Sequence, residues 1–194
     1  MKKALSIILS LIFVFLIVSC SSNGSKEETT TAGTTEQTTQ AETTTQFVEY
    51  VDEEGRLVVA NAKSLMEKLD MGIRVTNAAS NAKYYVVDEN VGMITFDFEN
   101  KSYVFKGSKE VKDFSLLSGV SGSVSNFYLI EVQNEALKGY FTVNQYGDGD
   151  NVTSTVVSWK SYEGTEHEAW YVIVCMKAVS ENEVNALLTR VIGI

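Results

Sequence analysis

The chain has 194 residues, of which 44% are hydrophobic, and its formal net charge is -9. An acidic chain without a cluster of lysine and arginine repels nucleic acid, so we expect no nucleic-acid partner. The length suits one globular domain with appended segments, and the absence of proline leaves turns to glycine, asparagine, aspartate and serine.

Residues 1–19 have the pattern of a lipoprotein signal peptide. Lys2 and Lys3 form a positive start, and an apolar run of sixteen residues (4–19) follows. This run is shorter than the roughly 20 residues of a membrane-spanning helix and fits the apolar part of a signal peptide. It ends in the letters IVSC, with Cys20 last, which resembles the bacterial lipobox. An uncleaved N-terminal anchor with an incidental cysteine is the alternative, and it also places the domain outside the cytoplasm.

The lipobox implies cleavage before Cys20 and acylation of its thiol, for example by palmitate. Two acyl chains are enough for stable anchoring, so we expect a lipid-anchored protein on the cell membrane, facing outside the cytoplasm at the surface of a Gram-positive type of cell. The membrane, reached through Cys20, is one predicted partner.

Residues 20–46 are predicted to be the lipidated cysteine and a disordered threonine-rich linker. After Cys20 this stretch holds only Ser, Thr, Glu, Gln, Gly, Ala, Asn and Lys, and it has no apolar period with which to bury a core. As a flexible coil it would span about 28 Å, so we interpret it as a spacer between membrane and domain.

Residues 47–194 are predicted to form one globular α+β domain, with a helix near each end. Asn61 can cap the first helix, whose apolar face includes Leu65 and Leu69, and Gly72 is predicted to end it. Ser180 and Glu183 form a capping box for the second helix, and Gly193 suits its C-terminal end.

Between these helices the apolar alternation predicts a curled antiparallel sheet of about six to seven strands, packed with the N-terminal and the C-terminal helix. The stretch AWYVIVCM (169–176) is apolar on both faces, so we place it in the centre of the sheet with a helix over one side. Residues 118–126 are predicted to be a loop. The predicted strands are residues 84–88, 94–98, 103–105, 127–133, 139–146, 154–162 and 169–176.

Three blocks carry a resemblance to a known family: SLMEKLDMGI, YVFKGSKEVKDFS and AWYVIVCMKAVSENEVNALLTRV. Together, over residues 48–194, they resemble an uncharacterised domain of Firmicutes-type bacterial lipoproteins, which is also found in extracellular parts of anti-sigma-type regulators. The chain departs from that pattern in having no proline after the first helix and Lys106 where arginine is usual. The resemblance implies an α+β fold and no established activity.

The chain has a single histidine, His167, which lies among Glu163, Glu166 and Glu168. A zinc site usually needs three or four ligands with two or more His or Cys, so we interpret this stretch as a solvated hairpin end. A Ser-His-Asp or Cys-His triad would need the same histidine, and Cys175 lies in an apolar strand as a buried, inert thiol. We therefore predict no catalytic residue, no metal site and no cofactor.

Two further patterns leave alternatives open. Asp148, Asp150 and Asn151 are interpreted as a hairpin turn, with weak calcium binding by Asp148 and Asp150 left open because EF-hand spacing is missing. The aromatic residues either pack in the core or form an exposed strip that binds a glycan or peptide. They include Trp159, Trp170 and the adjacent pairs Tyr84/Tyr85 and Tyr140/Phe141. The two members of each adjacent pair should lie on opposite faces of the sheet.

The pattern as a whole predicts a membrane-tethered module that binds an extracellular ligand or a protein partner without catalysis. An envelope sensor or chaperone-like lipoprotein is the alternative, and a carboxylate-based hydrolase is a third hypothesis. An exposed aromatic face would favour the first, a lined apolar cavity the second, and converging carboxylates the third.

Overall fold

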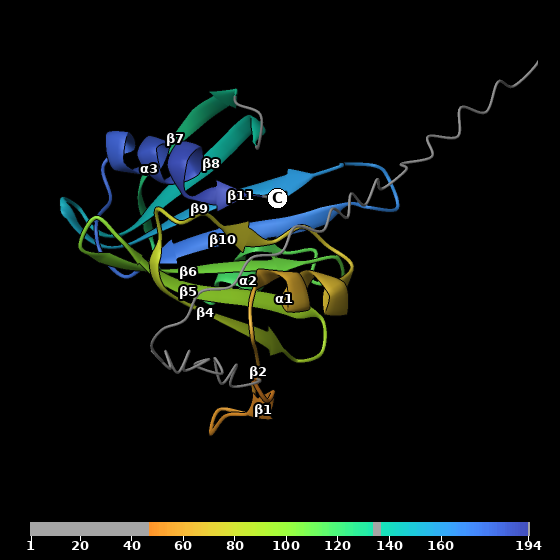
Figure 1. Cartoon of the computed structure of the whole chain (residues 1–194). Coiled ribbons are helices and arrows are strands. Elements are labelled where there is room, and N and C mark those ends of the chain that lie inside the picture. The colour runs from red at the N-terminus through yellow and green to blue at the C-terminus, as the bar shows by residue number, and fades with distance from the viewer. Residues whose placement is uncertain (1–46, 134–136, 194) are drawn as a thin grey trace, which may run out of the picture. The chain divides into compact units, whose positions relative to one another are not determined.

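Figure 1 shows the computed structural model, which describes residues 47–133 and 137–193. The predicted signal peptide (1–19), Cys20 and the predicted linker (20–46) lie outside the described residues. Within the described part, no helix is long and apolar enough to cross a membrane.

The described chain is an α+β structure dominated by one open sheet, in which every neighbouring pair of strands is antiparallel. The sheet has nine strands, so the prediction of six to seven was wrong. In spatial order they are β1 (Tyr50–Val51), β2 (Leu57–Val59), β4 (Ser80–Val87), β5 (Val91–Phe98), β6 (Lys101–Ser108), β10 (Ala169–Cys175), β9 (Asn151–Ser161), β8 (Lys138–Asp148) and β7 (Val124–Gln133).

The two strands beyond the prediction are β1 and β2, which extend the sheet past β4. They hold two and three residues, so they are too short to show a two-residue alternation in the sequence. A second, two-stranded sheet pairs β3 (Arg74–Val75) with β11 (Ile192–Gly193). Gly193 therefore lies in a strand, and its predicted role at the end of the last helix was wrong.

Three helices are described, and two of them were predicted. In α1 (Ala62–Leu69), the Asn61 side chain caps the first turn, but Asp70 in the left-handed conformation ends the helix, two residues before the predicted Gly72. In α3 (Glu181–Arg190) the predicted capping box of Ser180 and Glu183 is present. The third helix, α2 (Phe114–Ser118), was missed because five residues show less than two helical turns.

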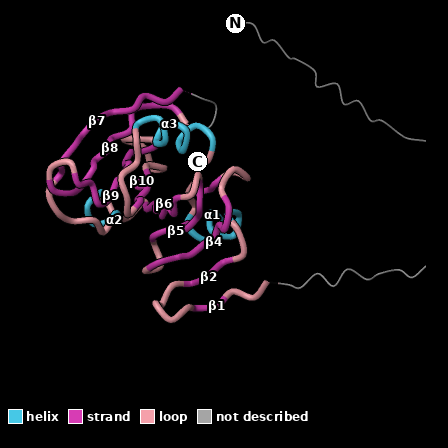
Figure 2. Tube along the Cα trace, turned by 90° about the vertical axis from the view of Figure 1, so that its left-hand side faces the viewer, coloured by secondary structure: helices cyan, strands magenta, loops and turns pink. Residues whose placement is uncertain are grey.

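Strand alternation gives the large sheet two different faces. The first face, which carries Ile94 and Phe105, forms the main core with Leu65 of α1 and Leu188 of α3. The opposite face carries smaller apolar clusters, and α2 packs there through Leu117. Figure 2 shows α2 on the opposite side of β6 and β10 from α1.

The predicted central strand is confirmed as β10, between β6 and β9. Its alternate residues are buried on both faces, Ile173 in the main core and Val172 beneath α2. The strand before it in space, β6, forms a hairpin with β5 through Glu99 and Asn100, both at positive φ, as two-residue hairpin turns require. The predicted loop of residues 118–126 ends earlier than expected, because β7 already begins at Val124.

Candidate functional site

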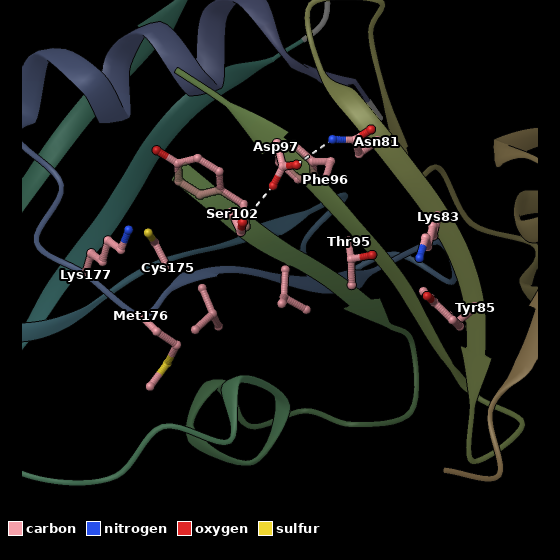
Figure 3. A pocket seen from close by; sticks show the side chains of 13 residues that line it. Asn81, Lys83, Tyr85, Thr95, Phe96, Asp97, Ser102, Cys175, Met176 and Lys177 are labelled. Atoms are coloured by element: carbon pink, nitrogen blue, oxygen red, sulfur yellow. Dashed lines mark hydrogen bonds between the residues drawn. The ribbon is translucent and has the colours of Figure 1, made fainter. Parts of the chain in front are cut away.

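A groove runs over the face of the sheet that α1 and α3 leave uncovered. It consists of two adjoining pockets of about 460 and 390 Å³, both lined by Val104, Val174 and Met176. We call the two pockets together the groove. The first pocket lies over β4, β5, β6 and the residues after β10, and Figure 3 shows it from close by. The second lies between the sheet and the end of α2.

The polar part of the first pocket is built by the β4–β5–β6 meander. Cross-strand pairing sets Asp97 opposite Ser102, and the alternation turns both side chains to the groove face. Asp97 accepts hydrogen bonds from Asn81 Nδ2 at 2.8 Å and from Ser102 Oγ at 2.6 Å, as the dashed lines of Figure 3 indicate. The hydrogen bond from Asn81, which has the larger effect, and the one from Ser102 lower the pKa of Asp97 below its usual value. The carboxylate is therefore ionised, and its oxygens already accept hydrogen bonds from within the protein.

One wall of the groove is the segment after β10, which holds Met176 and Lys177. Thr155 fixes this segment, because its Oγ1 donates to the Lys177 carbonyl at 3.0 Å and accepts from the Val179 N–H at 3.1 Å. Gln145 adds a third link by donating from Nε2 to the Val179 carbonyl at 2.8 Å. With its backbone held in this way, Met176 keeps 70% of its surface exposed over the groove.

The other wall is α2 and the turn that follows it. Asp113 caps α2 by accepting from the N–H groups of Ser115 and Leu116, and Phe114 packs on Trp170 with ring centroids 4.5 Å apart. Gly119 ends the helix with a φ of 70°, a left-handed conformation that favours glycine. The groove is therefore bounded by two segments that side-chain hydrogen bonds and ring packing hold in place.

Three lysines reach the groove, and sequence reasoning did not single out any of them as site residues. Lys83 and Lys177 line the first pocket from opposite sides, as Figure 3 shows, and Lys106 lines the second. Lys106 is half-buried, and this burial lowers its pKa below the usual value. In the described part of the chain, none of the three forms an ion pair.

The structure places the histidine cluster in an exposed turn between β9 and β10. The His167 side chain is 65% exposed, and its Nε2 lies 3.6 Å from Glu166 Oε1. The Glu168 carboxylate accepts hydrogen bonds from the Gly164 N–H and from Trp170 Nε1. Glu163 pairs instead with Lys160. Among the described residues, no three His, Cys, Asp or Glu side chains lie close enough together to hold a metal ion.

The interpretation of residues 148–151 as a hairpin turn is confirmed. Asp148 pairs with Asn151 at the ends of β8 and β9, and Gly149 adopts a φ of 55° in the turn between them. Both Asp148 and Asp150 are exposed there. The open alternative of weak calcium binding stays a prediction.

The adjacent aromatic pairs split across the sheet as predicted. Phe141 is buried in the main core, while Tyr140 points away from it and is 68% exposed. Trp159 is also buried in that core, and Trp170 is half-buried against α2. Most of the aromatic inventory is thus packing.

The last candidates are the two cysteines and one exposed apolar strip. The Cys175 thiol is 3% exposed in the main core, and burial raises its pKa, so the prediction of a buried thiol is confirmed. Cys20, the predicted lipidation site, lies outside the described residues. A surface strip of Phe127, Leu129 and Tyr140 is exposed on β7 and β8, at the edge of the sheet.

The groove can bind but has few groups for chemistry. Among its described lining residues, Asp97 is the one carboxylate, and it is held by two donors, whereas a glycosidase-type site needs two carboxylates facing one bond. Its floor is apolar and its rim is polar and basic, which is the usual make-up of a ligand site.

These features define an α+β protein built on an open antiparallel sheet, with a groove on the face opposite its two longer helices. Comparison of the chain with protein-family models, with curated proteins and with solved structures finds no match.

Proposed function

We propose that this chain is a lipid-anchored extracytoplasmic lipoprotein whose domain is a non-catalytic binding module, with the groove as its ligand site. The observation that carries the binding role is the groove itself, in which Val104 and Val174 form an apolar floor shared by two pockets and Met176 adds an apolar contact from the wall. Such a floor supplies contact area, and the polar groups around it orient a ligand.

The anchoring part of the proposal depends on the sequence before the described domain. The apolar run ending at Cys20 and the threonine-rich stretch up to residue 46 support a lipidated cysteine and a spacer. The resemblance of residues 48–194 to the α+β domain of Firmicutes-type lipoproteins supports the same assignment. In this reading the tether holds the groove outside the cytoplasm, where it meets extracellular ligands.

The other two hypotheses have less support. A hydrolase would need a second carboxylate facing Asp97 across the groove, and the groove's described lining offers none. A chaperone-like lipoprotein would need an enclosed apolar cavity, whereas both pockets of the groove open to solvent and carry polar groups at their rims.

The test is ligand binding by the full chain and by a variant whose groove wall carries an added charge. Met176→Asp places a carboxylate in the groove, and because Met176 is 70% exposed the change should not disturb folding. Leu116→Asp is the matched control, since Leu116 is 74% exposed on α2 and does not line the groove.

Ligands are found by thermal shift with a panel of wall glycans, peptides and small metabolites. We expect each ligand that stabilises the wild-type chain to lose binding to the Met176→Asp variant and to keep binding to Leu116→Asp. If every ligand found binds both variants equally, the groove is not the site, and if the wild-type chain turns a ligand over, the module is catalytic.

A further inference from the structure

The groove has a charge opposite to that of the chain as a whole. Its lining holds Lys83, Lys106 and Lys177 against Asp97 alone, while the chain has a formal net charge of -9. Because Asp97 is occupied by Asn81 and Ser102, the three lysines are the charges left to face a ligand.

These lysines also differ from most others in the described domain. Five lysines elsewhere have a carboxylate partner: Lys63, Lys68, Lys101, Lys109 and Lys160. A basic groove attracts an anionic ligand, and the acidic surface around it repels the same ligand. Binding is therefore directed to the groove.

Lys106 gives the strongest indication of a missing partner. It lies in the middle of β6, with a strand on either side, and a Cβ placed on Gly119 would be 4.0 Å from its Nζ. Its ammonium group has lost part of its hydration to burial under the end of α2. A ligand carboxylate beside it would supply the interaction that water no longer supplies fully.

The spacing of the lysines limits the shape of the ligand. In the ladder Lys83 pairs with Thr95, and Thr95 pairs with Val104, two residues from Lys106 on the same face. Two strand spacings and two residue steps put the backbones of Lys83 and Lys106 roughly 12 Å apart. In an extended peptide, side chains four residues apart lie on one face at roughly 13 Å, so two carboxylates at that spacing match the two lysines.

The lining between these lysines favours a peptide over a sugar chain. The aromatic side chains among the lining residues are Tyr85, Phe96 and Tyr103, and each is at most 8% exposed, so none offers an open ring on which a sugar could stack. Val104, in the same cross-strand row as Lys83 and two residues from Lys106, instead offers an apolar contact that suits an apolar side chain of a peptide.

We propose that the groove binds an acidic peptide in an extended conformation, with two carboxylates four residues apart at Lys83 and Lys106 and an apolar side chain between them against Val104. This ligand class rests on the proposed function, because it assigns an occupant to the same groove.

The probe is a fluorescein-labelled peptide of sequence TETLTET, compared with its neutral counterpart TQTLTQT. Both are titrated with the full chain in detergent micelles at low ionic strength, and binding is followed by fluorescence anisotropy. We expect TETLTET to bind about tenfold more tightly than TQTLTQT, because charge-assisted hydrogen bonds are roughly twice as strong as neutral ones, a difference that corresponds to about tenfold in affinity. Added salt should weaken the binding of TETLTET.

Substitutions assign the binding to the groove. Lys106→Gln should weaken TETLTET binding by about tenfold, and Lys83→Gln, at an exposed position where folding is not at risk, by about threefold. Lys138→Gln is the matched control, because it removes the same charge from an exposed lysine outside the groove and should change binding by about twofold or less.

Equal affinity for the two peptides, or unchanged binding in both lysine variants, would overturn the inference. Polygalacturonate and vesicles of anionic lipid serve as further arms. If one of these binds instead, and Met176→Asp abolishes that binding, the groove remains a ligand site and only the peptide class is wrong. If TETLTET binds equally well to wild type, Met176→Asp and the lysine variants, both proposals fail.

Discussion

Glu183 links the last helix to the sheet, and its charge should make a measurable contribution to stability. Lys101 Nζ on β6 donates to Glu183 Oε1, and the Ser180 N–H donates to Oε2 at 2.8 Å. These contacts, with that to Lys101 the largest, lower the pKa of Glu183 from 4.5 to about 2. The carboxylate is therefore more stable in the folded chain than in the unfolded one.

The magnitude and its pH range follow from this shift. A full shift from 4.5 to about 2 corresponds to about 3 kcal/mol at neutral pH, and because 32% of the side chain is exposed, solvent screening reduces it to about 1–2 kcal/mol. Since the pKa of the folded state is the lower one, the contribution is fully present above pH 4.5 and is lost as the pH falls toward about 2.

Glu183→Gln removes the charge but keeps an oxygen that can accept from Ser180, so it isolates the interaction with Lys101. We expect it to lower the free energy of unfolding by about 1 kcal/mol at neutral pH, and Glu183→Ala, which also removes the cap, by about 2 kcal/mol. Urea unfolding of the full chain, followed by the fluorescence of the buried Trp159, measures both values.

Glu181→Gln is the control, because Glu181 is an exposed acid in the same first turn and should cost less than about 0.5 kcal/mol. The difference between wild type and Glu183→Gln should shrink steadily on acidification below pH 4.5. A difference that stays constant down to the lowest pH at which the chain folds would refute the assignment of this stability to the Glu183 charge.

Three further predictions concern packing, the groove wall and the anchor. Gly107→Ala should destabilise the domain by about 1–3 kcal/mol, because a Cβ there would lie 2.8 Å from the Tyr171 ring; an unchanged urea midpoint would contradict this packing. Thr155→Val should cost about 1–3 kcal/mol and speed hydrogen exchange at the Val179 amide, since it removes two of the three side-chain hydrogen bonds described for the groove wall; unaltered exchange would show that other contacts hold the wall. Cys20→Ser should leave the chain unprocessed or release it from the membrane fraction, and unchanged membrane retention and gel mobility would rule out lipidation at Cys20.

The elements that could be predicted from the sequence are those long enough to show the apolar periodicity of a strand or a helix. The central strand β10 has seven residues with both faces apolar, and α3 combines a capping box with an apolar stripe, so each could be assigned locally. Among the elements that sequence reasoning missed, β2 and α2 have three and five residues. Their structure comes from tertiary contacts: β2 pairs with β4, and α2 is held by the packing of Phe114 on Trp170.

The groove could not be predicted in the same way, because its lysines come from distant parts of the chain. Lys83 and Lys106 come together only through the register of β4 with β5 and of β5 with β6, and Lys177 joins them because β10 pairs with β6. One signal was nevertheless present in the stretch SYVFKGS, where Lys106 alternates with Phe105 and Gly107. A lysine that alternates with core residues is ordinary in an edge strand, where it discourages unwanted pairing, but β6 lies between β5 and β10. In that position the lysine has a strand on each side and the end of α2 beside its ammonium group, and a partly dehydrated cation held there is better explained by a ligand than by solubility.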